Sequence, residues 1–156
     1  FKQLDLYKLV TEHKLLFASS EQQTVKIEIE QIDSPIMVEA DAGLMRQMLT
    51  NILKNASESM VEAGIGAPLI KIGFDRHTAG AITVRIADTG PGFSGSQLEQ
   101  YLEPYVTTRD KGTGLGLAIV QKIIMEHKGA IELANHPDGG GMVNITLPLI
   151  SVETTT

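Results

Sequence analysis

Three short segments of this chain carry residues whose types and spacing suit a phosphorylated ligand. Asn51 and Asn55 stand four residues apart, Asp88 opens the run Asp-Thr-Gly-Pro-Gly, and residues 112–117 read Gly-Thr-Gly-Leu-Gly-Leu. Residues four apart share one face of a helix, so the two amides are expected to point the same way. Two amides, one carboxylate and a run of bare backbone could surround a single nucleotide, provided that the fold brings them together.

The run 112–117 precedes an apolar helical pattern. Glycine lets the backbone approach a phosphate closely, and a helix that begins there offers free N–H groups and a partial positive charge to an anion. The run is not a Walker A loop, because no Lys-Ser/Thr pair follows its last glycine. It is a poor Rossmann fingerprint, because a polar loop precedes it. Taken alone, it is as consistent with a flexible helix entry as with phosphate binding.

The other two segments also have plainer interpretations. Asparagine inside a helix is mildly unfavourable, and a pair of them can be either a solvated face or two amide oxygens for a Mg²⁺ ion that already holds phosphates. Asp88 can be a turn aspartate bonded to its own backbone, or a carboxylate that accepts from an exocyclic amine such as that of adenine. For Asp88 alone, the turn interpretation is favoured.

The composition narrows the class of protein. The chain has 156 residues, of which 42% are hydrophobic and 21% charged, as in an ordinary globular domain. A net charge of −6 gives no basic footprint for nucleic acid, and the lack of cysteine excludes disulfides and thiolate metal sites. No apolar run approaches the roughly 18 residues of a membrane span. We therefore expect no nucleic-acid partner and no membrane contact by this chain.

Apolar periodicity predicts the helices that position these segments. Residues 42–62 form a long amphipathic helix with Asp41 as its N-cap. A looser helical pattern covers 4–18, with Asp5 as a possible cap. Residues 115–127 are also predicted to be helical, with Gly129 near a left-handed C-cap. A helix on each side of the glycine segments would then border the proposed site.

Alternating patterns predict the strands, with a Gly-Gly-Gly turn at 139–141. The expected strands are 25–30, 35–40, 69–76, 81–88, 130–134 and 142–149. Helices and strands do not alternate regularly, which disfavours a Rossmann fold. We expect an α+β fold, an α/β two-layer sandwich with helices packed on one face of a mixed, mostly antiparallel sheet.

In this order and spacing the three segments resemble the N, G1 and G2 boxes of the sensor histidine kinase catalytic domain, within the gyrase, Hsp90, histidine kinase and MutL superfamily. Leu102-Glu-Pro-Tyr-Val-Thr-Thr-Arg109 resembles the F box and the start of the ATP lid. The likeness runs from about Leu4 to Leu149 and is strongest to nitrogen-regulation kinases of the NtrY and NtrB type. It implies the Bergerat ATP-binding fold, with ATP and Mg²⁺ as cofactors.

The resemblance assigns roles by position. Asn55 would be the main Mg²⁺ ligand with Asn51 assisting, Asp88 would accept from the adenine amino group, and Gly90 and Gly92 would let the base enter. Backbone amides of one run would hold the phosphates: Gly112, Thr113, Gly114, Leu115, Gly116 and Leu117. The lid would contribute Thr107, Thr108, Arg109 and Lys111. Its two cations would reach the β- or γ-phosphate and, with Asn51, act in catalysis.

Three positions, Glu58, Ser59 and Leu102, depart from the histidine kinase pattern, and Asn51 differs from the ATPase branches of the superfamily. Glu58 and Ser59 stand where many members have a basic and an aromatic residue, so contacts from this helix should differ. Leu102 replaces a usual aromatic. Asn51 itself stands where the ATPase branches place a water-activating glutamate. A site without a general base is poor at hydrolysis but adequate for passing phosphate to a nucleophile positioned by another domain.

The resemblance implies that the acceptor is a histidine in a separate dimerisation domain. The four histidines of this chain are better explained as surface or capping residues: His13, His77, His127 and His136. We expect 1–18 to be a junction helix from an upstream dimerisation and phosphoacceptor domain, 19–150 the ATP-binding catalytic domain, and 151–156 a disordered tail. A response regulator receiver domain would take the phosphate later. We expect the isolated domain to be monomeric and cytoplasmic, or the cytoplasmic part of a membrane-anchored sensor.

Three alternatives remain open at this stage. A protein-serine kinase of the anti-sigma-factor type would share the same boxes. A non-enzymatic nucleotide-sensing module would bind the ligand without transfer. A weak ATPase is disfavoured by Asn51, which is a poor base.

Overall fold

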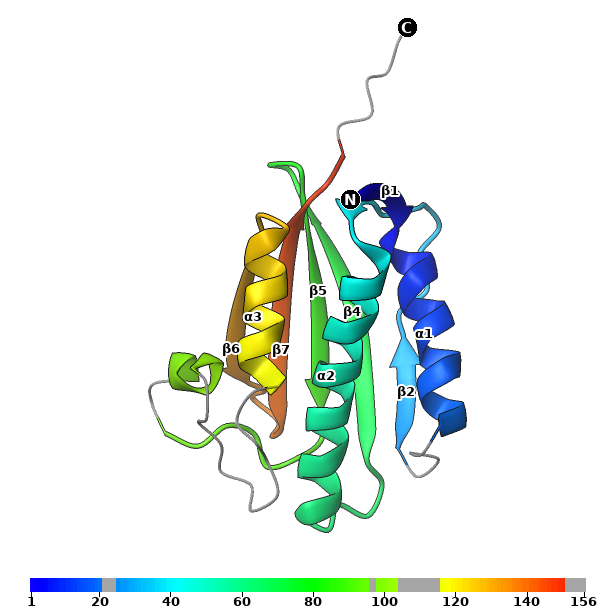
Figure 1. Cartoon of the computed structure of the whole chain (residues 1–156). Coiled ribbons are helices and arrows are strands. Elements are labelled where there is room, and N and C mark those ends of the chain that lie inside the picture. The colour runs from blue at the N-terminus through cyan, green and yellow to red at the C-terminus, as the bar shows by residue number, and fades with distance from the viewer. Residues whose placement is uncertain (21–24, 96–97, 104–115, 151–156) are drawn as a thin grey trace, which may run out of the picture.

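The computed structural model describes residues 1–20, 25–95, 98–103 and 116–150. Three helices cover one face of a five-stranded sheet, which confirms the expected two-layer α+β arrangement (Figure 1). The helices are α1 (Leu6–Ser20), α2 (Ala42–Glu62) and α3 (Gly116–Glu126). The strands of this sheet, in spatial order, are β2 (Lys26–Ile29), β4 (Leu69–His77), β5 (Ala81–Asp88), β7 (Gly141–Pro148) and β6 (Ala130–Asn135).

The sheet is mixed and mostly antiparallel, as predicted. Only the pairing of β2 with β4 is parallel among the strands that the structure describes. In the antiparallel part, β5 ends where β7 begins and β6 ends, and α3 begins at the same end of the molecule, the lower one in Figure 1. Residues distant in the sequence therefore meet at one edge of the fold.

A second sheet of two strands was not expected. The strands β1 (Lys2–Asp5) and β3 (Met37–Ala40) pair antiparallel with each other. The sequence pattern placed residues 4–18 in one helix, whereas the structure divides the chain at Asp5. The Asp5 Oδ1 atom accepts from the Tyr7 amide at 3.1 Å and from the Ile36 amide at 3.0 Å. One carboxylate therefore begins α1 and fastens it to the strand pair.

The long helix α2 matches its predicted bounds. The Asp41 carboxylate accepts from the Leu44 amide at 2.9 Å, as expected for an N-cap. Its apolar side chains at three- and four-residue spacing are buried: Met45, Met48, Leu49, Ile52, Leu53, Ala56 and Met60. They pack over the inward side chains of the sheet, and each fully buried Leu or Ile stabilises the fold by roughly 1.5–3 kcal/mol.

The end of α3 differs by one residue from the prediction. Lys128 takes the left-handed conformation (φ 59°), and the Gly129 amide bonds back to the Ile124 carbonyl at 2.9 Å. Glycine is required at 129 for another reason, because a Cβ there would lie 2.4 Å from the Thr146 carbonyl oxygen of β7. The residue that looked like a helix cap is a close contact between α3 and the sheet.

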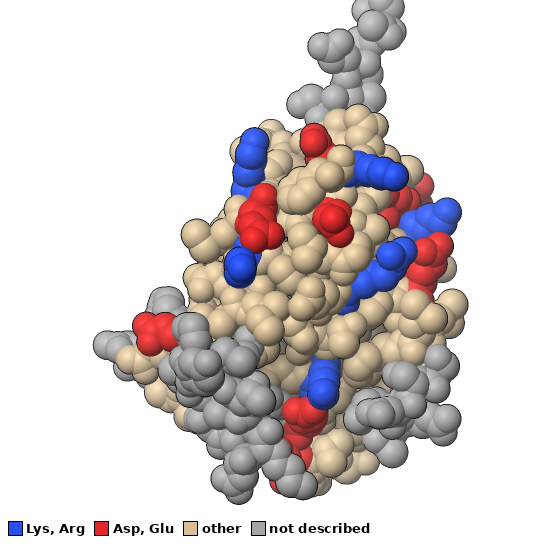
Figure 2. All heavy atoms as spheres, in the orientation of Figure 1, with Lys and Arg blue, Asp and Glu red and all other residues tan. Residues whose placement is uncertain are grey.

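A short 3₁₀ helix, η1 (Leu98–Leu102), lies between the Asp88 segment and α3 in the chain. The residues after it, 104–115, and the tail 151–156 lie outside the described part of the chain. Within the part that the structure describes, no helix is both long and apolar enough to cross a membrane. Basic and acidic side chains are interspersed over the helix-covered face (Figure 2).

Candidate functional site

The carboxylate of Asp88 is held at the end of β5 by two backbone amides. Its Oδ1 atom accepts from the Gly90 amide at 2.8 Å and from the Gly141 amide at 3.1 Å. Among the described residues, its second oxygen, Oδ2, has no hydrogen-bond partner. The turn interpretation was therefore half right, since the Gly90 bond is local but the Gly141 bond spans 53 residues. One oxygen fixes the carboxylate, and the other has no partner among the described residues and could accept from a ligand.

The carboxylate of Asp88 is partly withdrawn from water. Partial burial raises the pKa of Asp88, and the amides of Gly90 and Gly141 oppose that rise. A desolvated carboxylate gains more from an incoming donor than a fully hydrated one does, because less water is displaced. The geometry therefore suits recognition of an N–H group.

The β6–β7 hairpin forms the back of this site. Gly140 has φ +98°, and a Cβ on it would lie 1.9 Å from the Asp88 carbonyl oxygen. Sequence reasoning treated 139–141 only as a turn and missed its contact with Asp88. The available signal was the number of glycines, because a tight hairpin needs fewer than three in a row.

Gly90 and Gly92 are glycines because of what surrounds them. A Cβ on Gly90 would lie 3.0 Å from the Asp88 Oδ1 atom and 3.1 Å from Cγ of Met60 on α2. Gly92 has φ +80°, and a Cβ on it would lie 2.7 Å from Oδ1 of Asn135. The segment 88–92 is thus packed between the end of α2 and the end of β6.

The two asparagines lie on α2, with Asn55 one turn closer than Asn51 to the end at which Asp88 lies. Both are half-buried, and the Asn51 Nδ2 atom is buried without a hydrogen-bond partner in the described chain. The Thr89 hydroxyl donates to Sδ of Met60 at 3.3 Å, which joins the same half of α2 to the glycine segment. The polar face of α2 and the Asp88 segment therefore border one region.

Of the glycine-rich run, only Gly116 and Leu117 are described. Gly116 begins α3, a helix of 11 residues, and Leu117 is buried beneath it. The helix start is where the run 112–117 predicted it, at the same end as Asp88 (Figure 1). The remaining predicted residues lie outside the described residues: Thr107, Thr108, Arg109, Lys111, Gly112, Thr113, Gly114 and Leu115.

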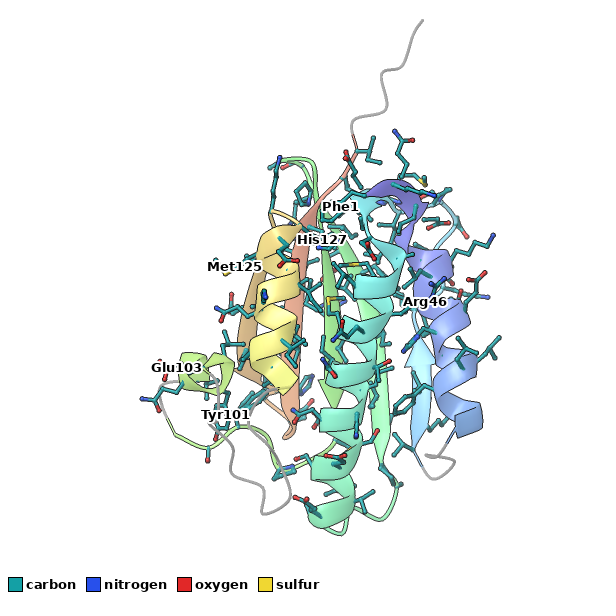
Figure 3. All side chains as sticks on the ribbon, in the orientation of Figure 1. Phe1, Arg46, Tyr101, Glu103, Met125 and His127 are labelled. Atoms are coloured by element: carbon teal, nitrogen blue, oxygen red, sulfur yellow. The ribbon has the colours of Figure 1, made fainter. Side chains whose placement is uncertain are left out.

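The four histidines all have structural surroundings. His13 is buried and bonds the Thr50 hydroxyl through Nε2 at 3.0 Å. His127 is also buried, with Nε2 accepting from the backbone amide at the start of α2 and its ring stacked on Phe1 (Figure 3). His77 bonds a β5 threonine at 2.7 Å, and His136 lies in the β6–β7 hairpin. His127 is buried yet caps helix ends, because it bonds the Asp41 amide at the start of α2 and the Ile123 carbonyl near the end of α3. The description as a surface or capping residue was wrong only for His13, which is buried and bonds a side chain.

A protein-family model described as histidine kinase-, DNA gyrase B-, and HSP90-like ATPase matches residues 40–151. The chain belongs to this family. The match covers α2, the Asp88 segment, α3 and the β6–β7 hairpin, which are the elements that form the site described above.

The curated proteins similar to this chain include a nitrogen regulation protein and a sporulation kinase. The chain is 46% identical over 111 residues to the nitrogen regulation protein NtrY of Azorhizobium caulinodans, covering 69% of this chain and 14% of that protein. It is 34% identical over 146 residues to sporulation kinase A of Bacillus subtilis, covering 93% of this chain and 23% of that one. The chain thus spans about a seventh to a quarter of the length of these two relatives.

The solved catalytic domain of the histidine kinase ThkA, in a nucleotide-free form, matches with a TM-score of 0.79 and 30% identity, covering 95% of each chain. The mycobacterial sensor histidine kinase MprB shares the fold, with a TM-score of 0.80 at 20% identity. This chain is the ATP-binding domain of a histidine kinase, and the anti-sigma-factor type of kinase is not favoured by these relatives.

Proposed function

We propose that this domain binds Mg·ATP at the Asp88 end of the sheet and presents the γ-phosphoryl group to a histidine of a separate dimerisation domain. The observation that carries the proposal is the half-satisfied carboxylate of Asp88. Two backbone amides occupy Oδ1, while Oδ2 is left without a partner among the described residues. Adenine offers an exocyclic amine of the kind that such an oxygen accepts from.

The asparagine pair would hold the metal. Mg²⁺ prefers oxygen ligands and is usually shared between a few protein groups and the phosphates of the nucleotide. Asn51 fits a site next to the metal and the phosphates. Its buried Nδ2 atom has no partner in the described chain and could donate to a metal-bound water or to a phosphate oxygen. We assign the direct contact to Asn55. When bound, the ion neutralises charge that develops on the transferred phosphoryl group.

The phosphates would lie at the start of α3. Free amides of the first turn and the helix dipole favour an anion there, and Gly116 and Leu117 supply two of those amides. We propose that 112–115 continue the same contact and that Thr107, Thr108, Arg109 and Lys111 complete the site from the lid, with the two cations nearest the γ-phosphate.

The reaction would be an in-line transfer. The bond between the γ-phosphorus and the oxygen bridging to the β-phosphorus breaks, a bond to a histidine nitrogen forms, and ADP leaves with the electron pair. Asn51 is no base, so this chain holds and orients the nucleotide rather than activating water. A receiver domain of a response regulator would take the phosphoryl group next. We place the domain in the cytoplasm, as a monomer when isolated.

Calorimetric titration tests the binding half of this proposal. Wild type should bind ADP and ATP, with ATP affinity increasing when Mg²⁺ is present, whereas Asp88→Asn should bind neither well. If the wild-type domain binds neither nucleotide, the proposal is wrong.

Phosphotransfer tests the second half. The domain is incubated with γ-labelled ATP and a separately produced histidine-bearing helix pair from a kinase of the same family. Label should appear on the helix pair in an acid-labile form, as a phosphorus–nitrogen bond requires. Acid-stable label would indicate a hydroxyl acceptor instead, and binding without any transfer would favour a nucleotide-sensing module.

A further inference from the structure

The carboxamide of Asn135 pairs with both backbone polar groups of one residue, Phe93, which follows the glycines of the Asp88 segment. Its Oδ1 atom accepts from the Phe93 amide at 2.7 Å, and its Nδ2 atom donates to the Phe93 carbonyl at 2.9 Å. Asn135 is the last residue of β6, where it pairs with Gly141 at the start of β7. The side chain thus joins Phe93 to the edge of the sheet, much as one more strand residue would be joined.

This pairing lies directly against the Asp88 segment. Gly92 approaches Asn135 so closely that a Cβ would be 2.7 Å from the Oδ1 atom. The Phe93 ring packs on Gly141, where a Cβ would be 3.2 Å from Cε2 of the ring. Gly141 is also the donor to Asp88. One end of the segment is therefore fixed by Gly141 through Asp88, and the other by Asn135 through Phe93.

The same segment continues into η1. The rings of Phe93 and Tyr101 lie 5.1 Å apart between centroids. The Tyr101 hydroxyl donates to the Ser94 carbonyl at 3.1 Å, accepts from the Ser94 amide at 3.2 Å and bonds the Ser94 hydroxyl at 2.8 Å. Tyr101 lies on η1, the element that precedes residues 104–115 in the chain (Figure 3).

We propose that Asn135 is a positioning residue for the nucleotide base. It touches neither phosphate nor metal in this arrangement, and it acts by holding Phe93 and Gly92 so that the unpaired oxygen of Asp88 faces the base. This inference rests on the function proposed above and adds to it a specificity role for the end of β6. A misplaced segment would weaken the contact that distinguishes adenine from guanine.

Asparagine suits this role because its planar side chain carries one donor and one acceptor. Aspartate keeps the shape and the acceptor but places an oxygen against the Phe93 carbonyl, and alanine removes both bonds. Each lost hydrogen bond of this kind lowers the population of the held segment by a few-fold, and because only the held segment would bind the base, losing both should weaken binding about tenfold.

The test compares Asn135→Ala, Asn135→Asp and the matched control Asn144→Asp. Asn144 lies on β7 of the same sheet, and its Oδ1 atom has no partner among the described residues, so the control adds the same charge away from the segment. Kd values for ADP and GDP are measured by calorimetry, and amide exchange at Phe93 by hydrogen–deuterium exchange. If the alanine variant does not fold, Asn135→Asp still tests the proposal, because aspartate preserves the shape of the side chain.

Both Asn135 variants should bind ADP about tenfold more weakly than wild type, lose much of the preference for ADP over GDP, and exchange the Phe93 amide faster. Asn144→Asp should match wild type in all three measurements. Unchanged ADP affinity, or an equal loss for both nucleotides, overturns the positioning role while leaving the proposed function in place. A wild type that binds no nucleotide overturns the proposed function itself, and this inference with it.

Discussion

The Gly141 amide donates to the Asp88 carboxylate at 3.1 Å across 53 residues of sequence. This bond joins the end of β5 to the start of β7 at a point just beyond their regular pairing. Together with the Gly90 bond, it decides which carboxylate oxygen is occupied within the fold and which one would be left for the proposed ligand. The proposed specificity of the site therefore depends on a backbone group that carries no side chain.

Removing the charge of Asp88 should separate stability from binding. The pKa of this carboxyl is raised in the fold, so the charged form at neutral pH destabilises the fold, and that penalty is relieved as pH falls through the folded pKa toward 3.8. In Asp88→Asn the remaining oxygen still accepts from Gly90 and Gly141. We expect an equal or higher Tm without ligand and roughly 10- to 150-fold weaker ADP binding, as for a lost charged hydrogen bond. A lower Tm with intact binding would contradict this account.

The two glycines at the tip of the β6–β7 hairpin form a matched pair. Gly139 and Gly140 both have φ +98°, but a Cβ on Gly139 meets open space whereas one on Gly140 would overlap the Asp88 carbonyl. Gly139→Ala should cost about 1 kcal/mol of unfolding free energy from backbone strain. Gly140→Ala should cost a further ~1–3 kcal/mol by overpacking and should weaken ADP binding. Equal costs in urea denaturation would show that the hairpin moves away freely.

Asn55 should govern the metal dependence of binding. Replacing it by alanine removes the amide oxygen proposed to contact Mg²⁺, while the Asp88 segment is left intact. We expect Asn55→Ala to bind ADP without Mg²⁺ as wild type does and to lose the gain in ATP affinity that Mg²⁺ gives. Titrations with and without the ion measure the difference, and an undiminished gain would assign the metal to other groups.

His13 should make the fold sensitive to mild acid. Burial, and then the nearby Arg46, lower the pKa of His13 below its ordinary 6.5. The neutral form is therefore favoured in the folded state, and its contribution is complete above pH 6.5 and declines as pH falls from there toward the folded pKa. Urea denaturation at several pH values should show this decline in wild type and a flatter profile in His13→Gln. Identical profiles would exclude His13 as the cause.

Much of the fold was predictable because its signals are local. The bounds of α2 followed from the Asp41 cap and a clear apolar stripe, and the β5 strand from strict alternation. The strand β1 before Asp5 was missed because its pairing partners lie far along the chain, as does Ile36, which bonds the Asp5 carboxylate from 31 residues away. Likewise, the role of Gly129 was misread because its close approach to β7 leaves no local signal, and Lys128 takes the left-handed conformation instead.

The candidate site likewise contains residues that the sequence predicts and residues that it does not. Asp88 and its glycines were found from spacing and resemblance, since those residues are close in sequence. Asn135 and Gly141 were missed because each acts on a partner 42 or 53 residues away, and neither belongs to a pattern that a single sequence displays. Contacts made by backbone groups leave no residue-type signal except an excess of glycine.

The sheet consists largely of two hairpins, β4–β5 and β6–β7, which close over short stretches of chain. The pairing of β5 with β7 closes a much longer loop, so it is entropically the slower step to form. Asp88 gains the Gly141 bond only once the two hairpins have docked. A nucleotide that requires this carboxylate would select fully assembled molecules and, by mass action, hold the hairpins together. Ligand affinity would then report on completion of the sheet during refolding.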